Sequence, residues 1–222
     1  MNDRRFHLVS VLSLTGAVLL SSVGLIVYAR SLTGEDSGAD LGIVRGKVSL
    51  AVSEVHLASL GPTVVFLEPQ DASTHLPTSK KPALIDQKEI KFIPDFLVVS
   101  VGQTVEMPNN DKVMHNAFSF SKPNEFDLGI YPRGESKDVI FKHPGVVDMF
   151  CSIHARMNAI IFVAPCQYHA RVDSADSFEI RGVPPGKYFL KTWNRKLPEA
   201  RETIEVLPGK TEEVLVKIQT KK

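Results

Sequence analysis

The sequence contains little cysteine, little tryptophan and no excess of charge of either sign. Two cysteines in a chain of 222 residues are too few for a fold that depends on several disulfide bonds. Lys and Arg number 26 against 25 Asp and Glu, and there is no basic stripe or phosphate-cradling glycine loop, so nucleic acid is not expected as a partner. No GxSxG or HExxH motif is present, so the common serine-hydrolase and zinc-protease chemistries are not indicated either.

Long apolar runs are absent except near the N-terminus. The segment Phe6–Ala29 contains no Asp, Glu, Lys or Arg, and it exceeds the about 20 apolar residues that a helix needs to cross a bilayer. Arg4 and Arg5 precede the segment and only Arg30 follows it, which favours a cytoplasmic N-terminus and an exported body. Residues 1–30 are therefore predicted to form an uncleaved single-pass membrane anchor, with the body on the periplasmic or extracellular side.

A cleaved signal peptide is the alternative for the same residues. Val27–Ala29 places small residues at offsets suitable for processing, and cleavage would release the body into the periplasm. Both alternatives export everything that follows. Residues 31–41 are rich in Ser, Gly and acidic side chains and are expected to form a flexible linker.

Beyond the linker, no segment has a convincing helical period, and apolar residues alternate as they do in β-strands. Leu97, Val99 and Val101, for example, would share one face of a strand. The pattern predicts an all-β body. The predicted strands are residues 43–50, 63–67, 88–93, 96–101, 104–107, 137–141, 146–151 and 159–165, with 70–84 as a long connection and 126–131 as a loop.

The most informative stretch is Cys151–Met157, which places a thiol, an imidazole and a thioether on one short loop. Alternation along the preceding strand directs Cys151 inward, as a buried ligand requires. His115, upstream, completes a set of one Cys, two His and one Met. Copper centres of the blue type take one thiolate and two imidazoles, with a weak axial contact from Met.

Residues 86–165 resemble a cupredoxin of the plastocyanin and amicyanin kind. In that family the first His ligand is followed by Asn, and the other three ligands lie on one loop near the end of the domain; His115–Asn116 and Cys151–Met157 match both elements. The resemblance implies a Greek-key β-sandwich and a single copper ion. It also implies that His115, Cys151 and His154 are the strong ligands, that Met157 is the axial ligand, and that Asn116 ties the two ligand loops together.

Taken singly, each ligand has a simpler explanation. His115 and Met157 could be ordinary core residues, and Cys151 could be a structural thiol or half of a disulfide. Their joint arrangement favours a metal site. Zinc is the alternative metal, although structural zinc usually takes two or more thiolates and no thioether. A Cys151–Cys166 disulfide is not expected, because about seven extended residues before Cys166 span over ~20 Å, whereas a disulfide needs Cα atoms within about 7 Å.

The C-terminal region has a second β pattern. Its Phe178–Leu190 stretch, with a Pro-Pro-Gly turn, resembles the second half of carboxypeptidase-regulatory or transthyretin-like sandwich modules. The opening strands of such a module occur before the cupredoxin segment. Residues 42–85 and 166–222 are therefore predicted to form one split β-sandwich into which residues 86–165 are inserted. The alternative is that residues 42–69 supply the first strands of the cupredoxin sheet.

Together these features predict a membrane-tethered type 1 copper protein that transfers single electrons outside the cytoplasm. A site with four protein ligands and no open position suits electron exchange better than bond-making chemistry, so an enzyme is not expected. The expected partners are unidentified redox proteins, without a small-molecule substrate. His154 would be the exposed electron port, beside Arg156. The alternatives are copper sequestration or delivery, and a non-redox interaction module of the cell envelope.

Overall fold

The computed structural model describes residues 40–51 and 55–219. The predicted anchor, residues 1–30, and nearly all of the predicted linker lie outside the described residues. Within those two ranges, no helix is long and apolar enough to cross a membrane. The described chain is all-β, as expected, apart from one 3-10 turn, η1 (Leu57–Leu60).

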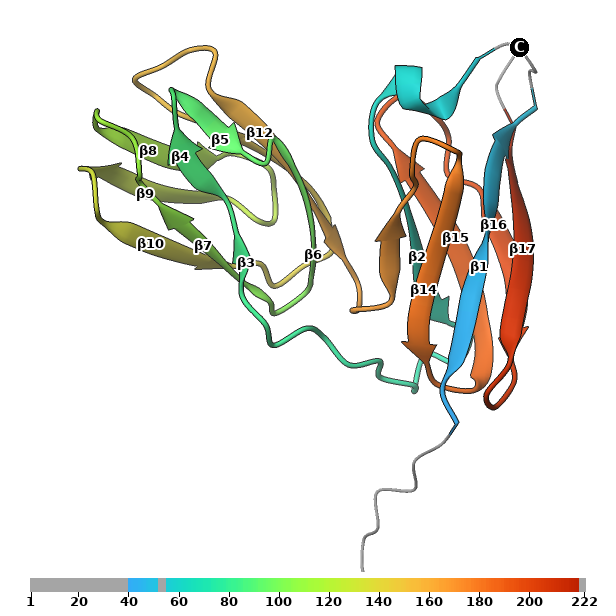
Figure 1. Ribbon diagram of the computed structural model, residues 1–222. Coiled ribbons are helices and arrows are strands. Elements are labelled where there is room, and N and C mark those ends of the chain that lie inside the picture. The colour runs from blue at the N-terminus through green and yellow to red at the C-terminus, as the bar shows by residue number, and fades with distance from the viewer. Residues whose placement is uncertain (1–39, 52–54, 220–222) are drawn as a thin grey trace, which may run out of the picture. The chain divides into compact units, whose positions relative to one another are not determined.

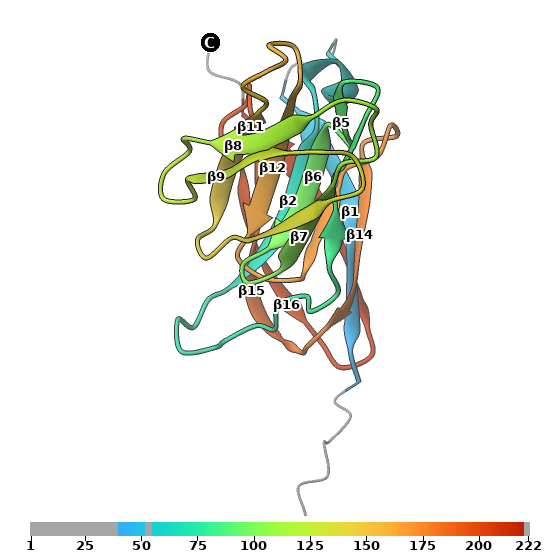
Figure 2. The same cartoon turned by 90° about the vertical axis from the view of Figure 1, so that its left-hand side faces the viewer.

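Two β-sandwiches account for the strands (Figure 1). The first, called the inserted sandwich, has a five-stranded sheet and a three-stranded sheet, and it faces the viewer in Figure 2. The larger sheet has the order β6 (Phe96–Ser100), β12 (Asn158–Ala164), β11 (Gly145–Phe150), β8 (His115–Ser119) and β9 (Phe126–Tyr131). The smaller sheet has the order β10 (Ser136–Ile140), β7 (Thr104–Pro108) and β3 (Ala83–Leu84), and β4 (Asp86–Lys88) pairs with β5 (Lys91–Ile93) as a separate hairpin.

The second sandwich, called the split sandwich, is built from both ends of the described chain. One sheet has the order β14 (Ser177–Val183), β1 (Gly42–Leu50) and β17 (Thr211–Ile218). The other has the order β13 (His169–Arg171), β2 (Thr63–Pro69), β15 (Gly186–Asn194) and β16 (Arg201–Val206). β1 is therefore enclosed by two strands that follow it by more than a hundred residues.

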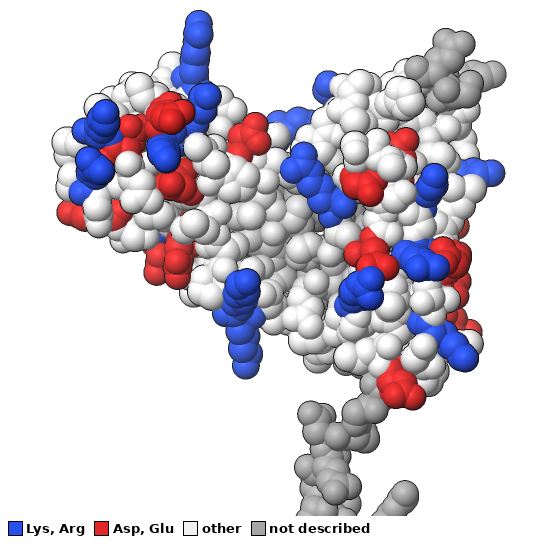
Figure 3. Space-filling model, in the orientation of Figure 1, with Lys and Arg blue, Asp and Glu red and all other residues white. Residues whose placement is uncertain are grey.

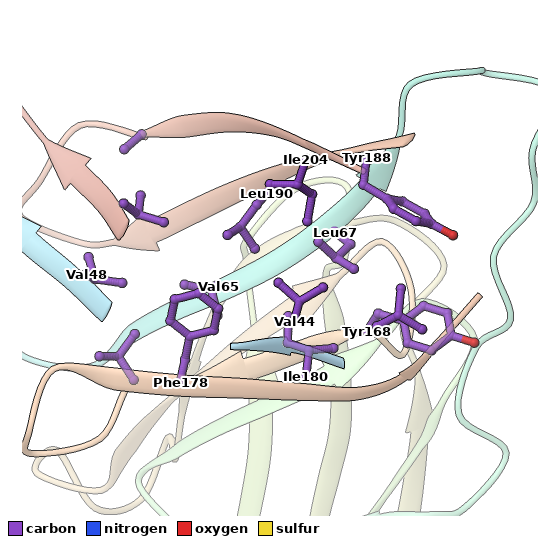
Figure 4. Close-up of a cluster of buried hydrophobic side chains, with 14 of the residues drawn as sticks. Val44, Val48, Val65, Leu67, Tyr168, Phe178, Ile180, Tyr188, Leu190 and Ile204 are labelled. Carbon is purple, nitrogen blue, oxygen red and sulfur yellow. The ribbon is translucent and has the colours of Figure 1, made fainter. Parts of the chain in front are cut away.

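The core of the split sandwich explains why these distant segments pair. Val44 and Val48 are buried on the inner face of β1, and Val65 and Leu67 are buried on β2 (Figure 4). They share one apolar cluster with side chains from the C-terminal strands, including Phe178, Tyr188, Leu190 and Val216. Leu97, Val99 and Phe141 belong to a different cluster, in the inserted sandwich. Residues 42–69 thus pack in the split sandwich and do not supply the first strands of the inserted one.

The boundary between the two sandwiches differs from the predicted residue 86. Ala83 and Leu84 form β3, which pairs in parallel with β7 of the inserted sandwich. Ile85 is fully buried in the same core, and its N–H donates to the carbonyl of Glu106 at 2.9 Å. The inserted sandwich therefore begins near residue 83. The long connection that precedes it is polar and rich in proline, so its sequence gives no sign of where pairing resumes.

Two predicted elements within the inserted sandwich were wrong. Residues 88–93 are not one strand but part of the β4–β5 hairpin, whose tight turn has Glu89 and Ile90 at φ 54° and 56°. Such a turn normally contains Gly or Asn, and neither residue is present to signal it. Residues 126–131 form strand β9 and not a loop, because pairing with β8 outweighs the interruption of their apolar pattern by Gly129.

A third apolar cluster includes side chains from both sandwiches. The ring of Trp193, from β15, stacks on Phe96 of β6 and on Phe162 of β12, with centroid separations of 5.9 Å and 4.9 Å. Stacked aromatic pairs of this kind contribute about 0.5–1.5 kcal/mol beyond the burial of their area. Trp193 is thus a packing residue.

The close approach of β1 and β17 makes Gly46 a test of the split arrangement. A Cβ atom built at Gly46 would overlap the backbone carbonyl of Val214, which faces it in parallel register. Gly46→Ala should therefore destabilise the protein by about 1–3 kcal/mol or more in denaturant unfolding, because two backbones must move apart. Lys47→Ala, at the neighbouring exposed position, is the control and should have a small effect. Equal stability of the two variants would contradict the pairing of β1 with β17.

Candidate metal centre

Strand β11 carries Cys151 into the core of the inserted sandwich. Val147 and Met149 are fully buried on its inner face, while Asp148 and Phe150 are at least partly exposed. Continuing this alternation by two residues turns Cys151 inward, where its side chain is 5% exposed. The position of the predicted thiolate ligand therefore follows from the period of one strand.

His115 is the first residue of β8, the strand next to β11 in the sheet. It is completely buried. The turn that leads into it is fixed by Asn109, whose side-chain amide donates to the carbonyls of Val113 at 2.9 Å and Tyr131 at 3.1 Å. Tyr131 lies opposite His115 on β9. The short amide side chain thus holds the turn that delivers the imidazole, as such residues do where the backbone reverses.

The structure brings His115, Cys151 and His154 together as one group of potential metal ligands. The two Nδ1 atoms are 3.1 Å apart, and Cys151 Sγ lies 4.0 Å from Nδ1 of His115 and 3.7 Å from Nδ1 of His154. The point equidistant from these three atoms is about 2.1 Å from each, close to the ~2.0 Å and ~2.3 Å typical of metal bonds to imidazole nitrogen and thiolate sulfur. The triangle formed by these three donor atoms therefore has the dimensions at which all three could bind one first-row transition-metal ion.

Met157 returns to the same core at the end of the ligand loop. Its side chain is 1% exposed and belongs to the apolar cluster that contains Cys151. Two backbone hydrogen bonds close the loop: the Cys151 N–H donates to the Met157 carbonyl at 3.1 Å, and the Met157 N–H donates to the His154 carbonyl at 2.9 Å. The loop thereby places a thioether residue, a soft and weak potential ligand, beside the thiol.

The two sheets and the placement of the ligands agree with the architecture implied by the sequence resemblance. His115 begins a strand of the larger sheet, and the other candidate ligands, Cys151, His154 and Met157, lie on the loop between the neighbouring strands β11 and β12. The inserted sandwich has a cupredoxin-like fold.

Solved structures similar to this chain include the following three. A purple cupredoxin from Nitrosopumilus maritimus is 24% identical, with 37% of this chain and 99% of that chain covered and a TM-score of 0.34. A reduced amicyanin variant is 21% identical, with 44% and 98% covered and a TM-score of 0.34. A copper-containing nitrite reductase from Thermus scotoductus SA-01 is 24% identical, with 52% and 28% covered and a TM-score of 0.36.

Sequence comparisons give one further match. The model of polysaccharide lyase family 4, domain II, matches residues 157–214, a range that runs from Met157 through β12 and most of the C-terminal strands of the split sandwich. No curated protein matches the sequence. The predicted resemblance of the split sandwich to carboxypeptidase-regulatory or transthyretin-like modules therefore stays a prediction.

Asn116 joins the two ligand segments of the cupredoxin-like sandwich. Its Oδ1 atom accepts hydrogen bonds from the Ser152 N–H at 2.7 Å and the Ser152 hydroxyl at 2.9 Å. Asn116 follows His115, and Ser152 follows Cys151, so each hydrogen-bonding residue is adjacent to a ligand. The side chain is 4% exposed, which shields both bonds from competing water. This contact is the one that the resemblance implied for Asn116.

Asp111 is a contributor to the site that the sequence analysis did not identify. Its Oδ2 atom lies 2.9 Å from Nε2 of His115. A hydrogen bond from the Ile90 N–H is the main cause that lowers the pKa of Asp111 to about 2; burial opposes the shift, and His115 and the Lys112 N–H add to it. Asp111 is thus ionised at physiological pH. Its position four residues before a ligand, in an Asn-Asn-Asp turn, is the only signal that sequence offers.

The second cysteine lies away from this centre. Both cysteines are free, and Cys166 is buried in the core of the split sandwich, whereas Cys151 lies in that of the cupredoxin-like sandwich. The Cys166 thiol donates to the carbonyl of Leu67 at 3.3 Å, and burial raises its pKa to about 11. Cys166 is therefore held as an unreactive thiol, and no Cys151–Cys166 bridge is formed.

Asn116→Ala should weaken metal binding in addition to lowering stability. The substitution leaves the Ser152 N–H without its acceptor, which should cost about 1–3 kcal/mol of unfolding free energy. Loss of the hydrogen bonds between Asn116 and Ser152 should also lower metal affinity by about 10–100-fold, because residues that hydrogen-bond next to the ligands keep the ligands in orientation. Denaturant unfolding and metal titration measure the two effects.

Asn124→Ala is the matched control. Asn124 is 8% exposed, and its amide donates to the carbonyl of His143 at 2.8 Å, with no contact to a ligand. It should lose comparable stability but keep its metal affinity. If both variants lost affinity equally, the effect would be one of stability alone and Asn116 would have no role at the site.

Proposed function

We propose that this chain is a membrane-tethered type 1 copper protein that carries single electrons outside the cytoplasm. The observation that carries the proposal is the close triangle of one thiol and two imidazole nitrogens, whose centre lies at metal-bonding distance from all three atoms. Copper is favoured over zinc because the fourth candidate ligand is the thioether of Met157, a soft donor that structural zinc sites do not use. Bound there, copper would supply the Cu(II)/Cu(I) couple.

The burial of the donors supports electron exchange over bond-making chemistry. His115, Cys151 and Met157 are 0%, 5% and 1% exposed, so no substrate could reach the metal from their side. Metal-assisted catalysis needs a coordination position open to water or substrate. Four protein donors, one on strand β8 and three on one short loop, would fill a four-coordinate site and leave no position open. We therefore infer that the protein is not an enzyme.

The proposed electron port is His154. Unlike His115 it is only partly buried, so one ligand of the set reaches the surface. Its neighbour Ile153 is 47% exposed, and Met114, next to the other His, is 52% exposed. Exposed apolar side chains close to a redox centre suit brief contact with a protein partner, since short-lived complexes need small interfaces.

Charge around this region would orient a partner without selecting nucleic acid. Acidic and basic side chains are interspersed over the inserted sandwich in Figure 3, and no extended patch of one sign is seen on that face. Arg156 is exposed on the ligand loop beside the port and could steer an acidic partner. The partners are therefore inferred to be redox proteins.

The place of the protein in the cell is inferred from sequence. The apolar segment within residues 1–30 and the arginines before it support a single-pass anchor with the copper domain on the periplasmic or extracellular side. Processing of that segment would release the same domain into the periplasm.

The experiment for the proposed function is Cu(II) titration of the exported body, followed by visible absorption. One Cu(II) per chain should produce an intense thiolate-to-copper charge-transfer band, blue or green. Cys151→Ser should abolish the band, whereas Cys166→Ser, the matched control, should keep it because that thiol lies in the other core. Colour retained without Cys151 would overturn the assignment.

Met157→Leu tests the fourth ligand. The colour should remain, and the reduction potential should rise, because losing a weak axial donor destabilises Cu(II) more than Cu(I). An unchanged potential would remove Met157 from the ligand set. Rapid transfer of Cu(I) to a competing chelator would favour copper delivery over electron transfer, since a labile site suits a carrier of copper ions.

A further inference from the structure

The contact between Asp111 and His115 constrains the hydrogen of the imidazole ring. Both oxygens of the Asp111 carboxylate accept backbone N–H hydrogen bonds, so the 2.9 Å contact with Oδ2 places the hydrogen on Nε2 of His115. In the neutral ring, Nδ1 then keeps its lone pair. Nδ1 is the atom that faces Nδ1 of His154 and Sγ of Cys151. Asp111 thus selects the tautomer that can bind a metal at the centre of the triangle.

Three further hydrogen bonds hold Asp111 in this position. The Ile90 N–H donates to the same Oδ2 atom at 2.6 Å, and the Lys112 N–H donates to Oδ1 at 2.7 Å. The Asp111 N–H donates to the side chain of Asn109 at 3.0 Å. Asp111 is 9% exposed, so these bonds are shielded from water. The carboxylate is therefore fixed before any metal binds.

The hairpin that supplies the Ile90 N–H is itself unusual. Ile90 has φ 56°, a conformation that is rare for a β-branched residue and costs about 1–3 kcal/mol. The side chain is 45% exposed, so burial of the isoleucine does not explain the conformation. What the turn does accomplish is to direct the Ile90 N–H at Asp111 on another loop. Strained backbone of this kind is found where surrounding contacts at a functional site maintain it.

We propose that Asp111 is a positioning residue that lowers the reduction potential of the copper centre through His115. The inference rests on the proposed function. A carboxylate bonded to the far nitrogen makes the imidazole a more basic ligand. It also adds a negative charge close to the metal. Both effects stabilise Cu(II) more than Cu(I), because the ion of higher charge gains more from electron donation and from the negative charge.

Asp111→Asn is the decisive variant because it keeps the shape and an acceptor oxygen but removes the charge. The ratio of Cu(II) to Cu(I) affinity should fall about tenfold, which raises the potential of this one-electron couple by about 59 mV. Redox titration of the copper-loaded protein, followed by the charge-transfer band, measures the shift. Asp86→Asn is the matched control. Asp86 lies on β4, and its carboxylate accepts a hydrogen bond from the Asn110 amide at 3.0 Å. The substitution therefore removes one nearby negative charge from a residue that is hydrogen-bonded to no candidate ligand.

The outcomes separate this inference from the proposed function. If the wild-type chain gives no thiolate-to-copper band, the proposed function fails. If it gives the band but Asp111→Asn leaves the potential unchanged, or if Asp86→Asn shifts it equally, the role of Asp111 is refuted.

A second measurement needs neither a variant nor copper. Nitrogen-15 NMR of the metal-free wild-type protein should show His115 with hydrogen on Nε2 at neutral pH. Hydrogen on Nδ1 would overturn the proposal even if Asp111→Asn did not fold.

Discussion

The candidate metal centre depends on one constraint: three polar donor atoms must be held within 4.0 Å of one another at the edge of an apolar core. They come from two segments 36 residues apart in the chain. Burying such groups is unfavourable unless each has partners, so the fold must hold them by other contacts. Asn116 joins the two segments, Asp111 orients His115, and the backbone of Met157 closes the loop after Cys151. The candidate ligands are thus held in place by hydrogen bonds within the protein.

The strands beneath the ligands explain how that geometry is kept rigid. His115 begins β8 and Cys151 directly follows β11, adjacent strands in the middle of a five-stranded sheet. Sites placed on sheets are positioned more accurately than sites on free loops. Electron transfer benefits from this, because a centre that keeps its shape in both oxidation states loses little energy to rearrangement. The one strained turn in the region, at Ile90, is directed at the same centre.

The split sandwich contributes a scaffold and no chemistry that the described residues reveal. Its first strands, β1 and β2, are completed only by strands that follow the cupredoxin-like sandwich. The inserted segment therefore leaves and re-enters one domain, and the stacking of Trp193 on Phe96 and Phe162 joins the two. In this arrangement the metal-binding unit is anchored at both of its ends, which limits its motion more than a single linker would.

The sequence by itself determined the all-β class and the set of candidate ligands. Strand alternation and the spacing of Cys151, His154 and Met157 are local properties, and a period of two directs Cys151 inward whatever the rest of the chain does. The sequence did not reveal the β4–β5 turn, strand β9 or the start of the inserted sandwich near Ala83. The β4–β5 turn lacks the Gly or Asn that usually marks such a turn. Strands β9 and β3 are defined by their pairing with β8 and β7, and pairing of this kind outweighs local propensity.

Only the tertiary structure decided the role of Asp111 and the sandwich to which β1 belongs. An aspartate in a tight turn is usually explained by the turn itself. It becomes part of the candidate metal centre here because Ile90, on a hairpin that precedes it by about twenty residues, directs an N–H at the same carboxylate oxygen that contacts His115. Likewise, the need for a glycine at position 46 becomes apparent only when β17 places the backbone of Val214 against it. Residue types and short spacings are written in the sequence, whereas hydrogen bonds between distant segments exist only once the chain has folded.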